Sequence, residues 1–189
     1  MIVIVGLGNL GKKFERTRHN FGFLIVDELQ KNYSFQDWQK NKTNICFYSW
    51  GTISDKKVEL VKPLTFMNDS GRAIAYVIKK HRLNTNNGLY VIHDDIDLAL
   101  GKFKISAGRG AAGHKGVESI IKTLKNNEFL RFRVGIQPLS GKPRNAENFV
   151  IKQFSKKEQL VIGQVIEKTI QAVLFTIAYG PEAAMNKFN

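Results

Sequence analysis

Residues 2–11 read IVIVGLGNLG, a run of β-branched residues followed by glycines at the spacing G-x-G-x-x-G. The run 2–5 is apolar throughout, which is typical of a central strand buried on both faces of a sheet. The glycine spacing is that of a dinucleotide-binding turn, which needs a helix to begin at the third glycine. Here the apolar residues of helical spacing begin only at Phe21, well after Gly11. The sequence therefore argues against a bound dinucleotide.

Strands and helices alternate along the rest of the chain. Apolar spacing predicts helices over 21–31, 73–81 and 117–124, and strands over 45–50, 58–61, 89–92, 103–105 and 132–136. The last long helix opens with Ser155 and Glu158, the spacing of a capping box, and ends at Gly180 and Pro181. The stretch NTNNG at 84–88 is expected to be a loop. This order predicts one α/β domain over residues 1–189, with a twisted, mixed and largely parallel central sheet flanked by helices.

The charge of the chain is strongly basic and unevenly distributed. Its 189 residues carry a net charge of +13, and residues 101–150 hold ten Lys and Arg against three acidic residues. Such a localised excess favours a polyanionic partner, with nucleic acid ahead of an anionic membrane surface. The alternative is a basic surface that is merely solvated.

The composition also bears on compartment. Cys46 is the only cysteine, so we expect a small buried apolar side chain rather than a disulfide or a cysteine metal cluster. The N-terminus lacks the pattern of a signal peptide. The most apolar run, 160–179, is expected to fall short of a membrane span. It is interrupted by four polar residues: Gln164, Glu167, Lys168 and Gln171. We therefore expect a cytoplasmic protein that is not in a membrane.

Polar side chains gather where the predicted strands end, which is where sites form in open α/β sheets. They are Asn9, His19, Asn20, Asn68, His93, Asp94, Asp95, Asp97, His114 and Lys115. Each has an ordinary alternative. Asn68 can cap the next helix, and His19 can be a surface histidine. The three aspartates can form a solvated turn or can bind Mg²⁺ together with His93. Asp94 and Asp95, as neighbours in a strand, point to opposite faces and do not easily share a metal.

Taken together, several segments resemble the bacterial-type peptidyl-tRNA hydrolases. They are VGLGNLGKKFERTRHNFGF, KPLTFMNDSG, VIHDDIDLALGKFKIS, GHKGVESI, RFRVGI and the terminal AMNKFN, in family order. The combination of TRHN, TFMN-x-SG and HDD-x-D is far more specific than a glycine motif alone. The resemblance implies hydrolysis of the ester between a peptide and the 3′ ribose of tRNA, which recycles tRNA from stalled ribosomes.

The resemblance also implies residue roles. His19 is the general base, Asp94 orients it, and Asn9 belongs to the catalytic group. Asn68, Phe14, Phe66 and Lys115 are expected to bind substrate. The acceptor arm of tRNA is expected to meet four basic residues: Lys102, Lys104, Arg131 and Arg133. No G-x-S-x-G elbow is present, so water is expected to attack directly, and we expect a monomer without metal or cofactor.

Three positions depart from the family pattern. Leu10 replaces a usual proline, Phe14 a frequent tyrosine, and Lys115 the asparagine of GHNG. An ammonium cannot accept a hydrogen bond, and we expect Lys115 to extend towards solvent or a tRNA phosphate. Two other functions stay open, namely a catalytically idle RNA-binding relative, like certain organellar splicing factors, and a Mg²⁺-dependent nuclease.

Overall fold

A seven-stranded mixed sheet forms the centre of the computed structural model, which describes residues 1–189, with strand order β2-β3-β4-β1-β5-β7-β6. Strand β1 is parallel to its neighbours β4 and β5, and β5 is parallel to β7, whereas β2, β3 and β6 run antiparallel to their partners. The strands are β1 (Ile2–Gly6), β2 (Gln39–Lys40), β3 (Cys46–Ile53), β4 (Lys56–Pro63), β5 (Leu89–Ala99), β6 (Phe103–Ser106) and β7 (Leu130–Gln137). The predicted mixed, largely parallel α/β sheet is confirmed.

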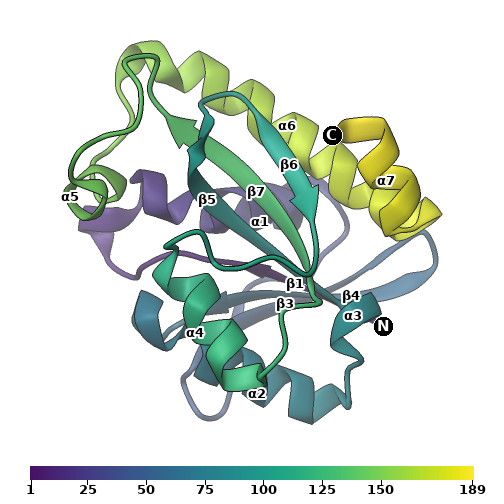
Figure 1. The fold of residues 1–189 in the computed structure, drawn as a ribbon. Helices are drawn as coiled ribbons and strands as arrows, with labels where there is room; N and C mark the ends of the chain where they lie inside the picture. Colours follow the sequence, from purple (N-terminus) through teal and green to yellow (C-terminus); the bar gives the residue numbers. More distant parts are fainter.

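Helices cover both faces of this sheet. The helices are α1 (Phe21–Asn32), α2 (Ser70–His81), α3 (Thr85–Gly88), α4 (Lys115–Leu124), α5 (Ala146–Val150), α6 (Lys156–Tyr179) and α7 (Pro181–Phe188). Three 3₁₀ turns are η1 (Lys12–Phe14), η2 (Arg18–Asn20) and η3 (Met67–Asp69). Figure 1 shows α1, α6 and α7 on one face and α2 with α4 on the other. Because β1 lies between the two layers, its alternate residues enter two separate hydrophobic cores, which explains the unbroken apolar run.

The first two glycines of residues 6–11 allow close packing, and the third has a backbone conformation that favours glycine. A Cβ on Gly6 would lie 2.3 Å from the carbonyl oxygen of Gly22, so these two glycines allow α1 to lie directly against β1. The loop continues to Gly11, which has a φ of 107°, and α1 begins only at Phe21. The arrangement that a pyrophosphate needs at the third glycine is therefore missing, as the sequence indicates.

The helices and strands differ from those expected in five places. Residues 85–88 form the short helix α3 instead of a loop, and β5 continues beyond residue 92 to Ala99. Strand β2 and helices α5 and α7 were not expected from the sequence. All five differences involve short or polar stretches, in which hydrophobic periodicity is too brief to be detected. The capping box is confirmed, since Ser155 and Glu158 each bond the other's backbone N–H.

Contrary to the expectation from its polar residues, helix α6 is long and apolar enough to cross a membrane when judged by length and composition alone. In the fold, its side chains at Val165, Ile170, Val173 and Ile177 belong to the larger core. The apolar stripe of α6 is thus packed inside the protein.

Candidate active site

A cleft of about 730 Å³ lies at the carboxyl ends of the parallel strands. The cleft receives Asn9 from the loop after β1, His19 from η2, Phe66 from the loop after β4, Asn68 from η3 and Asp94 from β5. The segment before and within α4 adds His114 and Lys115, and the opposite wall comes from α5 and its flanks. Residues distant in sequence therefore converge on one concave surface, as the sheet topology predicts.

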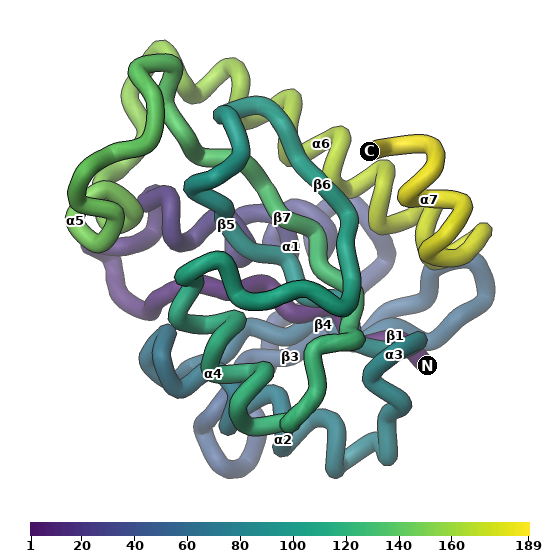
Figure 2. The backbone as a smooth tube through the Cα atoms, in the orientation of Figure 1, coloured from purple at the N-terminus to yellow at the C-terminus, as the bar shows by residue number.

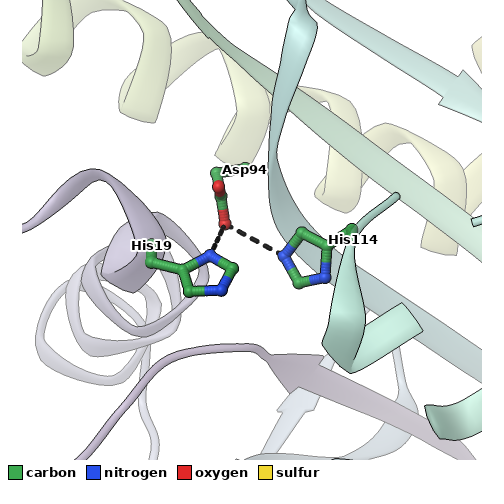
Figure 3. A group of neighbouring side chains, drawn as sticks. All are labelled: His19, Asp94 and His114. Carbon is green, nitrogen blue, oxygen red and sulfur yellow. Dashed lines mark hydrogen bonds and ion pairs between the residues drawn. The ribbon is translucent and has the colours of Figure 1, made fainter. Parts of the chain in front are cut away.

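Asp94 joins two histidines at the inner end of this cleft (Figure 3). Its Oδ1 lies 2.9 Å from Nδ1 of His19 and 3.0 Å from Nε2 of His114. Asp94 is buried, while His19 keeps some exposure and lines the cavity. One carboxylate oxygen thus fixes the orientation of both imidazole rings.

The hydrogen bonds define the tautomer of each ring. Nδ1 of His114 accepts the backbone N–H groups of Gly116 and Val117 at the start of α4, so the proton of neutral His114 is on Nε2, which donates to Asp94. His19 donates from Nδ1 to Asp94, and its Nε2 has no protein hydrogen-bond partner. Nε2 of His19 is therefore free to accept a proton from a group in the cleft.

The protonation equilibria follow from the same contacts. Burial lowers the pKa of His19, but the charge and hydrogen bond of Asp94 outweigh it, so the pKa lies above its ordinary value. Burial alone raises the pKa of Asp94, whereas His19 and His114 hold the pKa well below its usual range. Burial lowers the pKa of His93, which stacks edge-on against His114 and stays neutral. The site thus contains an ionised carboxylate beside a basic imidazole.

Asn20 holds Asn9 in place through its backbone. The Asn20 side chain accepts the N–H of Asn9 at 2.8 Å and donates to the carbonyl oxygen of Asn9 at 2.9 Å. The amide side chain of Asn9 is left to face the cleft. Asn68 is exposed there too, and it is not a helix cap, because the N-cap of α2 is Asp69. Two amides therefore stand ready to donate and accept hydrogen bonds.

Lys115 and Glu147 form an ion pair at the mouth of the cleft. Nζ of Lys115 lies 2.6 Å from Oε1 of Glu147, and both side chains are largely exposed. Lys115 also lowers the pKa of His19, although less than burial does. The expectation that Lys115 extends towards solvent or phosphate is therefore incomplete, since its ammonium bridges α4 and α5.

The four predicted tRNA-binding residues divide into two kinds. Lys102 and Lys104 are exposed on or beside β6, and Lys104 pairs in register with Arg133 of β7. Nε of Arg133 donates to the carboxylate of Asp95 at 2.7 Å. Because Asp95 lines the cleft, the guanidinium of Arg133 lies at its edge.

Arg131 requires a correction. Only 1% of it is exposed, and its guanidinium donates to the carbonyl oxygens of Gly110 and Arg109 at 2.8 and 2.7 Å. It is therefore enclosed by the glycine-rich loop SAGRGAAG at residues 106–113 and cannot meet a phosphate as predicted. Arg131 instead fastens the loop that leads to His114.

Phe14 is the one expected substrate contact that does not line the cleft. Its carbonyl oxygen accepts the N–H and hydroxyl of Thr17, so it shapes the turn before His19. Asn20 and His114 have roles that do not follow from the sequence, although Asn20 lies in TRHN and His114 in GHKG. The wall at residues 142–151 was also missed, and its sequence carries no pattern that marks it.

Metal ligation can be assessed from the same geometry. The ligand atoms of His19, Asp94 and His114 lie within 4.8 Å of one another, so these three residues are close enough to share an ion, but both ring nitrogens of His114 are already engaged in hydrogen bonds. The aspartates considered for Mg²⁺ do not converge, because Asp95 pairs with Arg133 and Asp97 with Lys142. Asp94, Asp95 and Asp97 of β5 therefore do not form a three-carboxylate site.

The fold and this site together define an α/β protein with a histidine–aspartate pair suited to activating water. The family model described as peptidyl-tRNA hydrolase matches residues 3–189. Curated relatives of that name from Thermodesulfovibrio yellowstonii and Bacillus subtilis are both 39% identical, over 100% of this chain and 99% and 98% of theirs. The crystal structure of peptidyl-tRNA hydrolase from Acinetobacter baumannii superposes with a TM-score of 0.90 at 29% identity, covering 100% of this chain and 94% of that one. The chain belongs to the peptidyl-tRNA hydrolase family.

Proposed function

We propose that this protein hydrolyses the ester bond between a peptide, or an N-blocked amino acid, and the 3′ end of tRNA. The observation that carries the proposal is the His19–Asp94 hydrogen bond of 2.9 Å in a cleft where Nε2 of His19 is unpaired. Family membership supplies the substrate class.

In this reaction His19 acts as the general base. Nε2 takes a proton from water while the water oxygen forms a bond to the ester carbonyl carbon. The ester bond to the ribose 3′ oxygen then breaks, and that oxygen takes the proton from the imidazolium. Asp94 stabilises the imidazolium between these two transfers, which is the role of the carboxylate in a catalytic triad.

The two amides hold the substrate. Asn9 and Asn68 bind the peptide backbone through groups that every peptide shares, with Phe66 as an apolar contact beside them. The side chain of Asn9, that of Asn68 or a backbone N–H stabilises the oxyanion. The enzyme is therefore expected to accept peptides of any sequence.

Phosphates of the acceptor arm bind Lys102, Lys104 and Arg133. The exposure of the two lysines and the pairing of Lys104 with Arg133 beside the cleft support this role. Such contacts add affinity with little sequence preference. We expect a monomer that acts in the cytoplasm, where ribosomes release peptidyl-tRNA.

The test is single-turnover and steady-state hydrolysis of an N-acetyl-aminoacyl-tRNA. His19→Ala is expected to keep the fold and to lose about 10²- to 10⁴-fold in kcat, the usual contribution of a general base. Near-native turnover by folded His19→Ala would contradict the assignment. Tight tRNA binding without hydrolysis by the wild-type protein would favour the idle RNA-binding alternative.

A further inference from the structure

Arg18, the residue before the proposed base, is buried even though it lies in a highly charged segment. Only 6% of it is exposed. Its Nη2 donates to both carboxylate oxygens of Glu158 at 2.9 Å. Its Nη1 donates to the carbonyl oxygens of Lys152 and Gln153 at 3.1 and 2.9 Å. A guanidinium that bonds a carboxylate with one nitrogen and two carbonyl oxygens with another is held in one orientation.

Further contacts fix the same residue from its faces and its backbone. The guanidinium carbon lies 4.3 Å from the ring centroid of Phe149 and 5.0 Å from that of Phe154. The N–H of Arg18 donates to the carbonyl oxygen of Lys152, and Thr17 forms a β-bridge with Gln153. The first residue of η2 and the residue before it are thus fastened to residues 149–158.

Residues 149–158 continue directly from the cleft wall. Glu147, Asn148, Val150 and Ile151 line the cavity, opposite His19. Figure 2 shows α5 beside the purple segment that leads into α1. One face of the His19 turn is therefore held by Asp94 and the other by the cleft wall.

We propose that Arg18 is a positioning residue for this reaction: its contacts with Glu158 and residues 149–154 hold the η2 turn so that His19 Nδ1 stays on Asp94. Arg18 does not line the cleft, and its guanidinium contacts Lys152, Gln153 and Glu158 instead. It acts through the backbone of His19, and so links the position of the base to that of the α5 wall. This inference rests on the proposed role of His19.

Loss of Arg18 is expected to change the titration of His19. The charged and titratable groups that face His19 are Asp94, His114 and Lys115. Asp94 raises the pKa of His19 above its ordinary value despite burial. If η2 shifts and the contact with Asp94 lengthens, the pKa falls back towards the ordinary value, and the acid limb of the pH–rate profile moves to lower pH.

The experiment uses Arg18→Gln, Arg18→Lys and Glu158→Gln in the full chain. We expect Arg18→Gln to lower kcat about 10- to 100-fold, as for a displaced catalytic group, with KM for N-acetyl-aminoacyl-tRNA little changed. Arg18→Lys is expected to rescue only part of kcat, because an ammonium cannot make the hydrogen bonds to Glu158, Lys152 and Gln153 at the same time. Glu158→Gln is expected to shift kcat and the acid limb in the same direction, and it decides the test if Arg18→Gln does not fold.

A matched control separates positioning from stability. Glu59 is a carboxylate with 1% exposure that contacts Lys80 and His81 at 2.9 and 2.6 Å and does not line the cleft. Glu59→Gln is expected to lower Tm without moving the acid limb. If Glu59→Gln moved the limb as much as Arg18→Gln did, general destabilisation would replace positioning.

NMR titration of the His19 ring measures the same effect without turnover. The expected result is a lower pKa of His19 in folded Arg18→Gln and Glu158→Gln than in the wild type. Folded variants in which the pKa of His19 and kcat both equal the wild-type values would overturn the inference. If the His19→Ala variant retained activity, the proposed role of His19 as the base would fail. The NMR titration of the Arg18 variants would still show whether Arg18 holds the His19 ring on Asp94.

Discussion

Replacing Asp94 by Asn tests how much the buried carboxylate contributes to the reaction. Asn keeps the shape of Asp94 but removes the charge that faces Nδ1 of His19 at 2.9 Å and Nε2 of His114 at 3.0 Å. A buried hydrogen bond to a charged group contributes about 1.5–3 kcal/mol. Since about 1.36 kcal/mol corresponds to a factor of ten, Asp94→Asn is expected to lower kcat about 10- to 100-fold. The loss should be smaller than that of His19→Ala, because the base itself remains.

The pH dependence gives this prediction its sign. Asp94 raises the pKa of His19 against the lowering effect of burial, so in Asp94→Asn burial dominates and the pKa falls. The acid limb of kcat/KM should therefore move to lower pH while the plateau drops. The assay is release of N-acetyl amino acid from tRNA between pH 5 and pH 9, with circular dichroism to verify folding. An acid limb that stays in place, or a kcat equal to that of the wild type, would refute the role of Asp94.

Three further predictions concern the charged surface and metals. Lys104→Ala and Arg133→Ala should each reduce the log–log salt slope of tRNA binding by about one, and binding independent of ionic strength would remove this surface from the proposal. Lys115→Asn should move the acid limb to higher pH, because the Lys115 ammonium lowers the pKa of His19. Glu147→Gln should move the acid limb to lower pH, because it leaves the Lys115 ammonium without its carboxylate partner. If both variants moved the acid limb in the same direction, the role of the ion pair would be contradicted. Hydrolysis should survive excess EDTA when the tRNA is already folded, and activity that returns only with Mg²⁺ would favour metal-dependent chemistry.

Local sequence was sufficient for the main elements of the fold. The apolar run at residues 2–5, the helical spacing from Phe21 and the capping box at Ser155 are properties of neighbouring residues, and each appears in the structure. The shorter elements α3, α5 and α7 did not follow from sequence, because a helix of one or two turns has too few positions to show a period.

The cleft was only partly accessible to sequence reasoning. Asn9, His19, Asn68 and Asp94 follow predicted strands, so the rule for parallel sheets places them at one edge, and they line one cavity. The bridging role of His114 was not predictable, because its ring must cap α4 with one nitrogen and reach Asp94 with the other.

The burial and pairing of the charged side chains were determined by tertiary structure alone. Arg131 and Arg133 occupy alternate positions of one strand, yet the glycine-rich loop covers the first, while the second bonds Asp95 and keeps some exposure. Arg18 and Glu158, like Lys115 and Glu147, are partners far apart in the chain. Sequence determined which residues are charged and which stretches form strands or helices, because those properties are local. Only the folded chain determined the burial and pairing of these charges, because both depend on segments brought together across long sequence separations.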